Sequence, residues 1–221
     1  MTFRLYTAPL SMFGMKVEIA LREKGIVPDI VMVAFDNARG YQPKHPEVLR
    51  INPKGQVPVL IHDDAEIYDS TQIFEYIEDL ALDPALWPSD RLARARARQL
   101  EHASDEVFFP HIIRLMGLQD ALDGEAASVS RLMAESYYER TDVRLAGQDW
   151  LAGSYSYADI AFFMALVFAE RLGAPLIDAT PKLAAWRDRM ASRQAIAPVM
   201  TRLVDYLTAN NRFVPAFLSR I

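Results

Sequence analysis

Residues 3–35 decide the fold, and they read FRLYTAPLSMFGMKVEIALREKGIVPDIVMVAF. The run Phe3–Thr7 is short, apolar and aromatic, which predicts a β-strand. The segment Met12–Lys24 carries apolar residues at helical spacing and stops at Gly25, which predicts a helix and its end. Val and Ile dominate Asp29–Phe35, which predicts a second strand. Strand, helix and strand within about 35 residues predict a βαβ unit whose two strands pair in parallel.

The residues that follow complete a small α/β domain. Val57–His62 and Glu66–Tyr68 predict the two strands of a hairpin, and Ser70–Leu80 predicts a helix after them. We therefore expect a ββα unit after the βαβ unit, in a first domain that spans residues 1–82. Residues 83–90, DPALWPSD, contain two prolines and no periodicity, which is typical of a linker.

The rest of the chain is helical in pattern. Residues 91–221 carry apolar residues at helical spacing in segments separated by Gly, Pro and Asp clusters. This pattern predicts a second, all-helical bundle domain, so the fold class is α/β plus all-α. The predicted helices are Arg91–Met116, Ser128–Leu145, Tyr157–Arg171, Pro181–Met190 and Ala197–Thr208.

Composition excludes several classes of function. The 221 residues are 51% hydrophobic and carry a net charge of −5, so the basic excess that nucleic acid demands is missing. The chain has no cysteine, so any thiol chemistry needs a thiol brought by a ligand. No apolar run reaches the roughly 18 residues of a membrane span, and no signal peptide is visible, so we expect a cytoplasmic protein.

Three predicted helices begin with residues that cap helices well. Ser11 precedes the first helix, and Asp69 precedes the helix that begins at Ser70. Ser156 and Asp159 form a capping box before an apolar run, and we expect this pair to be structural. The helix start at Ser70 also presents free N–H groups and a positive dipole end, which suit an anion.

Four stretches, in this order, resemble cytosolic glutathione transferases over nearly the whole chain. They are LYTAPLSMFGMKVEIALREKGI (5–26), NPKGQVPVL (52–60), IYDSTQIFEYIEDL (67–80) and LAGSYSYADIAFF (151–163). The chain is similar to serine-type bacterial members of that family, with some zeta-like and theta-like features. The resemblance implies a thioredoxin-like glutathione-binding domain followed by a helical bundle, and glutathione as co-substrate with no bound metal.

The resemblance also implies how the thiol is activated. Ser11 falls where serine-type members hold the hydroxyl that donates a hydrogen bond to the glutathione sulfur. A free thiol has a pKa of about 8.5, and such a bond near a helix amino terminus lowers it by favouring the thiolate. Tyr6 is the rival, because other classes use a tyrosine near the end of the first strand. For Tyr6 alone, packing in the strand is the simpler interpretation.

Six residues are expected to hold glutathione, by the same resemblance. A proline inside a strand removes a ladder donor, and a strand that begins at Pro58 resolves this. The family implies a cis Val57–Pro58 bond that turns the Val57 backbone toward the cysteinyl unit of glutathione. Ser70 would bind the γ-glutamyl carboxylate while Asp69 accepts from the ammonium. Gln56 stands where many relatives have lysine at the glycyl carboxylate, and Lys54 is a nearby cation that compensates.

The second substrate is expected between the two domains, as a small apolar electrophile. The expected lining residues are Phe13, Phe108, His111, Ile112 and Arg171. His111 has no visible ligand partner at helical spacing, so no metal site is predicted.

Two other functions fit the same motifs. A glutathione-dependent isomerase of maleylacetoacetate type would use Arg171 on a substrate carboxylate, as the zeta class does. A non-catalytic binding or regulatory protein would keep the fold without the activity. The family resemblance further implies a homodimer, and the arginine face formed by Arg91, Arg94 and Arg98 is a candidate contact between its subunits.

Overall fold

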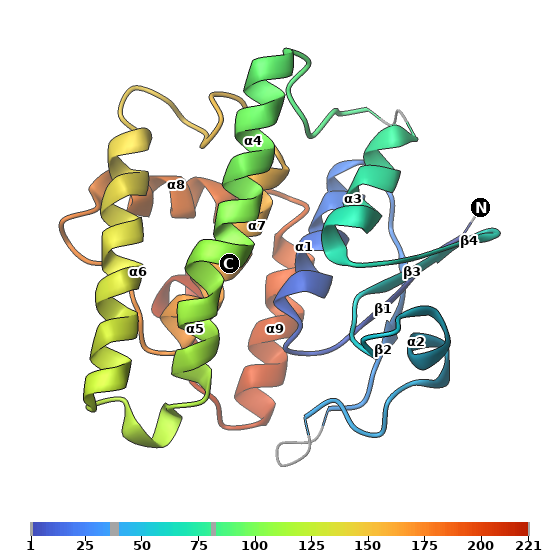
Figure 1. Cartoon of the computed structure of the whole chain (residues 1–221), viewed down its shortest axis with the longest axis horizontal. Helices are drawn as coiled ribbons and strands as arrows, with labels where there is room; N and C mark the ends of the chain where they lie inside the picture. Colours follow the sequence, from blue (N-terminus) through green and yellow to red (C-terminus); the bar gives the residue numbers. More distant parts are fainter. Residues whose placement is uncertain (1, 36–39, 81–82, 221) are drawn as a thin grey trace.

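The computed structural model describes residues 2–35, 40–80 and 83–220. A four-stranded sheet with its helices forms one part, and a bundle of helices forms the other (Figure 1). The α/β plus all-α class predicted from the sequence is therefore confirmed. The predicted domain boundary at residue 82 lies outside the described residues.

The sheet has the order β2-β1-β3-β4. Its strands are β1 (Phe3–Thr7), β2 (Asp29–Met32), β3 (Val59–His62) and β4 (Ala65–Tyr68). β1 runs parallel to β2 and antiparallel to β3, and β3 and β4 form the hairpin. β2 ends at Met32, three residues earlier than expected, because its partner Thr7 is the last residue of β1.

Three helices cover the two faces of the sheet. They are α1 (Met12–Glu23), α2 (Pro46–Ile51) and α3 (Ser70–Asp79). α1 and α3 bury Val17 and Ile73 against Leu5 on one face. On the other face, Val48 of α2 packs against Tyr6. The apolar residues of β1 therefore alternate between two cores, as a strand covered on both sides requires.

Gly14 lets the first turn of α1 lie directly on the end of β1. A Cβ atom at this position would come within 1.9 Å of the Thr7 Oγ1 atom. Any larger residue must therefore push the helix away from the strand. The turn that carries Ser11 and Phe13 is held in place by this close approach.

The second part contains six helices and a π-helical turn among the described residues. They are α4 (Arg91–Ala103), the π-helical segment Ser104–Phe108, α5 (Phe109–Met116), α6 (Glu125–Arg144), α7 (Tyr157–Arg171), α8 (Pro181–Ala191) and α9 (Ala197–Ala209). Short 3-10 turns lie at Gln119–Ala121 and Ala216–Arg220. The long helix expected over Arg91–Met116 is thus interrupted, and π-helical turns are frequently found at functional sites.

The start of α7 is fixed by the buried carboxylate of Asp159. Its Oδ1 accepts from the Leu151 N–H at 3.0 Å and from Trp186 Nε1 at 2.9 Å. Its Oδ2 accepts from the N–H and the hydroxyl of Ser156, at 3.0 and 3.2 Å. Burial raises the pKa of Asp159 to about 6, against the effect of these donors. The expected capping box is confirmed, and it also joins α7 to α8.

Buried charges join the two parts of the molecule. Glu18 of α1 pairs with Arg202 of α9, and Glu23 accepts from both Arg193 and Tyr155. Within the segment 83–90, Leu86 and Trp87 are buried, at 1% and 4% exposed. The two parts therefore meet along α1, with ion pairs and a hydrogen bond across the contact. Within the described residues, no helix is both long and apolar enough to cross a membrane.

Candidate functional site

One cavity lies where the sheet, the start of α1 and the end of α4 meet. Its walls come from both parts of the chain. Seven of the lining residues were expected from the sequence, namely Phe13, Lys54, Gln56, Val57, Pro58, Asp69 and Ser70. Seven others were not, namely Asn52, Tyr68, Thr71, Glu101, His102, Asp105 and Glu106.

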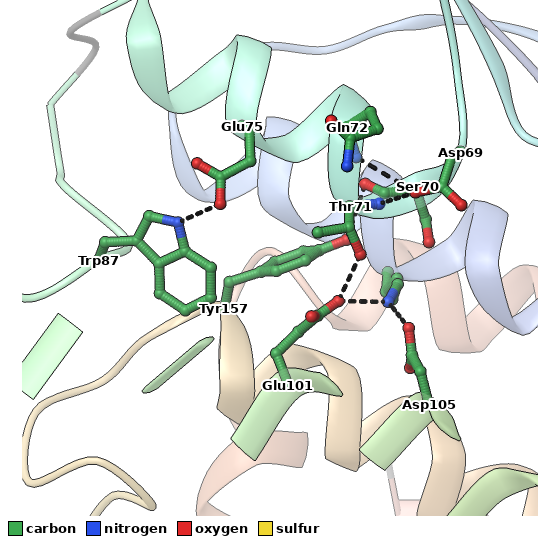
Figure 2. Close-up of polar contacts among 10 residues, drawn as sticks. Asp69, Ser70, Thr71, Gln72, Glu75, Trp87, Glu101, Asp105 and Tyr157 are labelled. Atoms are coloured by element: carbon green, nitrogen blue, oxygen red, sulfur yellow. Dashed lines mark hydrogen bonds and ion pairs between the residues drawn. The ribbon is translucent and has the colours of Figure 1, made fainter. Parts of the chain in front are cut away.

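The start of α3 forms one end of this cavity. Asp69 has a φ of 73°, in the left-handed region that non-glycine residues rarely adopt. Its Oδ1 accepts from the N–H groups of Thr71 at 3.1 Å and Gln72 at 3.3 Å (Figure 2). Ser70 is 5% exposed and still lines the cavity. A helix start with a hydroxyl and a positive dipole end suits a carboxylate.

The turn before β3 forms the opposite end. The Val57–Pro58 peptide bond is cis, as expected, and β3 begins just after it at Val59. Asn52 fixes the turn, because its Nδ2 donates to the Gln56 carbonyl at 2.6 Å and its Oδ1 accepts from the Lys54 N–H at 2.9 Å. The side chains of Lys54 and Gln56 are exposed at the rim. This end offers an amide and a cation to a second carboxylate.

Ser11 is the N-cap residue of α1. Its Oγ accepts from the Gly14 N–H at 3.0 Å, which leaves its own hydroxyl hydrogen free to donate. The residue is 7% exposed and is not itself among the lining residues, whereas Phe13 is. The capping role and the expected catalytic role are therefore compatible. The helix dipole at this position favours an anion such as a thiolate.

Tyr6, the rival to Ser11, lies in the core of the sheet domain. It is 4% exposed, and its ring packs 4.9 Å from the His45 ring. It does not line the cavity. Its position is the one expected of a packing residue.

A buried ion cluster closes the floor of the cavity across the domain boundary. The Lys16 ammonium lies 2.9 Å from Glu101 Oε1 and also contacts Asp105, and it is fully buried. The Thr71 hydroxyl donates to the same Glu101 oxygen at 2.7 Å (Figure 2). Although burial lowers it, the charges of Asp105 and Glu101 raise the pKa of Lys16 overall. Burial raises the pKa of Asp105 to about 6, against the attraction of Lys16.

The cluster was missed by sequence reasoning. The available signal was a lysine on the buried face of the first helix, since Lys16 stands between Met15 and Val17. A buried lysine needs a carboxylate partner, but its partners lie 85 and 89 residues away along the chain. Tyr157 adds a further contact, because its hydroxyl donates to the Ser70 carbonyl at 3.2 Å.

The expected second-substrate residues divide into those at the cavity and those in the core. Phe13 lines the cavity, and its ring meets the Phe109 ring edge-on at 5.6 Å. Phe108 and Ile112 do not line it; they are 1% and 0% exposed in the core of the bundle. This placement corrects the expectation for both, because they belong to the core of the bundle, where the Phe108 ring packs against Phe162 of α7. His111 is half-buried. Burial lowers the pKa of its imidazole, and the positive charge of Arg114 lowers it further.

Arg171 also lies away from the cavity. It is 8% exposed at the end of α7, and its guanidinium lies 4.9 Å from the Phe168 ring. Burial lowers the pKa of Arg171 to about 10, and the charge of Arg212 adds to this effect. Arg171 is not among the residues that line this cavity, so the expectation that it faces the second substrate is not met.

Within residues 2–35, 40–80 and 83–220, no three His, Asp or Glu side chains gather as a metal site would require.

Two family models match the chain. The model described as the N-terminal domain of glutathione S-transferase matches residues 5–85. The model described as its C-terminal domain matches residues 107–194. The two matches fall on the sheet part and on the helical part respectively.

Individual relatives agree with these matches. A probable glutathione S-transferase, parC, of Nicotiana tabacum is 31% identical over 85% of this chain and 84% of its own. A maleylacetoacetate isomerase of Pseudomonas aeruginosa is 31% identical over 87% of this chain and 92% of its own. Among solved structures, a Tau class glutathione S-transferase from mango (Mangifera indica) has a TM-score of 0.78 at 28% identity. The match covers 94% of this chain and 98% of the mango chain.

Proposed function

The chain belongs to the glutathione S-transferase family, and from this premise we propose that it joins glutathione to an electrophilic carbon. Ser11 is the residue that activates the thiol. Its hydroxyl donates a hydrogen bond to the sulfur, and the amino terminus of α1 adds its dipole. Together they favour the thiolate, which is the nucleophile. The sulfur then forms a bond to carbon as the leaving group departs with its electron pair.

One observation carries this proposal, namely that one and the same cavity is lined by the start of α3 and by the Val57–Pro58 turn. Glutathione has a carboxylate at each end and a thiol between them. In the proposed pose, Ser70 and the α3 amino terminus hold the γ-glutamyl carboxylate, and Asp69 accepts from the ammonium. The Val57 backbone pairs with the cysteinyl unit, and Lys54 and Gln56 meet the glycyl carboxylate. The electrophile then enters beside Phe13.

The isomerase alternative needs cations to hold the two carboxylates of a maleyl-type diacid. Arg171 does not line the cavity, and Lys54 is the one lysine or arginine among its described lining residues. The wall formed by Glu101 of α4 and by Asp105 and Glu106 of the π-helical segment carries carboxylates instead. The geometry therefore favours transfer to an electrophile over isomerisation of a diacid.

The test is the ultraviolet absorbance of the bound glutathione thiolate, titrated against pH. We expect the bound thiol to have a pKa well below the ordinary value of about 8.5. Absence of glutathione binding would instead support a non-catalytic member of the family. Binding with an unshifted pKa would remove the proposed activation of the thiol.

Ser70→Ala is expected to weaken glutathione binding. The substitution removes a hydroxyl that donates to a carboxylate, and a hydrogen bond to a charged group is worth about 1.5–3 kcal/mol, or roughly tenfold or more in affinity. Calorimetric titration with glutathione measures the change. Ser128→Ala is the matched control, because Ser128 lies on α6, is not among the residues that line the cavity, and donates its hydroxyl to the Gly124 carbonyl. Equal affinity in Ser70→Ala and the control would contradict the assignment.

We also propose that the chain is a cytoplasmic homodimer with α4 at the contact. Arg94 and Arg98 already donate to the Pro88 carbonyl and to Glu75, so Arg91 is the member of the arginine face free to reach a second copy. We expect Arg91→Glu to shift sedimentation from twice the 25.0-kDa mass toward that of one chain. Arg96→Glu, on another face of α4, is the control. Unchanged association of Arg91→Glu would remove α4 from the contact.

A further inference from the structure

The wall that the helical part contributes to the cavity is acidic. It is formed by Glu101 and His102 of α4 and by Asp105 and Glu106 of the π-helical segment. Lys16 lies behind this wall with its ammonium fully buried, so it balances one of the carboxylates and leaves the others uncompensated. In the pose proposed above, the electrophile reaches the sulfur between this wall and Phe13.

One carboxylate oxygen in this wall lacks a partner. The Asp105 side chain is 9% exposed, and its Oδ2 contacts Lys16. Its Oδ1 is buried and has no hydrogen-bond partner in the described structure. A buried carboxylate oxygen without a donor is costly, and a positively charged group nearby would compensate for that cost.

Phe13 supplies a second feature that suits a cation. Aromatic ring faces attract ammonium groups, and rings combined with carboxylates are used to bind quaternary ammonium ligands. The Lys16 ammonium already lies 5.4 Å from the Phe13 ring centre. Phe13 also lines the same cavity as the carboxylates of Glu101, Asp105 and Glu106.

We propose that the second-substrate site selects electrophiles that carry a positive charge over those that carry a negative one, with Glu106 as a specificity-determining residue. This inference rests on the proposed transferase function and names the substrate class of the same site. Glutathione enters as an anion and becomes more negative as its thiol ionises. A cationic electrophile is then attracted by both the thiolate and the acidic wall, whereas an anionic one is repelled by both.

The test compares three benzyl chlorides that differ only at the para position. One carries a trimethylammoniomethyl group, one a methyl group and one a carboxylate. In each reaction the glutathione sulfur bonds to the benzylic carbon, chloride leaves with the bonding electrons, and the thiol proton passes to solvent. Each kcat/KM is divided by the uncatalysed rate constant with glutathione at the same pH. This division removes differences in intrinsic reactivity.

We expect the normalised kcat/KM of the cationic compound to exceed that of the anionic one by about tenfold or more at low salt, and the ratio to fall at about 0.5 M NaCl. Glu106→Gln should lower the ratio by about threefold, since it removes one nearby charge. Glu106 is exposed, so its replacement leaves the buried cluster intact. Glu139→Gln, an exposed position on α6, changes the net charge equally and should leave the ratio unchanged.

Binding of the corresponding S-benzyl glutathione conjugates separates this inference from the proposed function. Tighter binding of the cationic conjugate without any turnover would support the charge preference and contradict the transferase function. Turnover of the neutral compound with no preference between the charged ones would overturn the charge preference alone. An unchanged ratio in Glu106→Gln would overturn the role of that residue.

Discussion

Ser11→Ala is expected to lower kcat/KM for glutathione transfer by about 10- to 150-fold. This range corresponds to the roughly 1.5–3 kcal/mol that a hydrogen bond to a charged group contributes. The bound thiol should at the same time regain a pKa near its ordinary value of about 8.5. Ser11→Thr keeps a hydroxyl on the same backbone position and should retain much of the activity. Thiolate absorbance and steady-state kinetics on the three proteins measure both effects.

Loss of the α1 cap must be separated from loss of the donor. The Ser11 hydroxyl also accepts from the Gly14 N–H, and an alanine at an N-cap position costs about 1 kcal/mol of stability. Asp90→Ala provides the control, because Asp90 caps α4 by accepting from the Ala93 N–H at 2.8 Å. It should lose similar stability and keep its activity. A lowered thiol pKa that survives in Ser11→Ala would transfer the role to the backbone N–H groups or to Tyr6.

Asp159→Ala is expected to destabilise the fold by about 4 kcal/mol or more, a large share of the roughly 5–15 kcal/mol typical of a folded protein. The substitution leaves the Leu151 N–H, the Trp186 Nε1–H and two Ser156 donors without an acceptor in a buried site. Each orphaned donor carries its own desolvation cost. Urea unfolding, followed by circular dichroism, measures the change.

Two variants test why Asp159 matters. Trp186→Phe removes one of the four donors and should cost less than Asp159→Ala. Asp142→Ala removes a carboxylate that accepts from the Lys182 and Leu183 N–H groups at the start of α8, so it should also cost less. Whatever folded Asp159→Ala protein remains should have normal kcat/KM, since Asp159 is not among the residues that line the cavity. Reduced activity in a fully folded variant would show that the residue does more than hold α7.

Local signals predicted most of the fold. Apolar spacing and end residues placed α7 at Tyr157–Arg171, the bounds observed in the structure. Strand pairing sets the end of β2, which the residue pattern does not predict. β2 stops at the residue that pairs with the last residue of β1, although the apolar pattern of the sequence continues beyond it. The π-helical segment was also beyond the pattern, since its residues suit an α-helix equally well. The division into domains at residues 82 and 91 stays a prediction.

The candidate site was predictable where its residues are neighbours in the chain. Asp69 and Ser70 follow from helix capping, and Val57–Pro58 from the family resemblance. The acidic wall was not predictable, because Lys16 meets Glu101 only after two distant helices pack. Phe108 and Ile112 were assigned to the cavity for their apolar character, which a core residue shares.

The π-helical segment between α4 and α5 allows a change in chain length that an uninterrupted helix would not tolerate. Each residue added to or removed from an α-helix turns everything beyond it by about 100°. Ser104–Phe108 already accommodates the wider turn, with Asp105 and Glu106 toward the cavity and Phe108 in the core. Removal of one residue here would convert the π-helical turn to an ordinary α-helical turn, and α5 would keep its packing against α7. The segment is therefore the place where the chain can remodel the entrance for the electrophile without rebuilding the bundle.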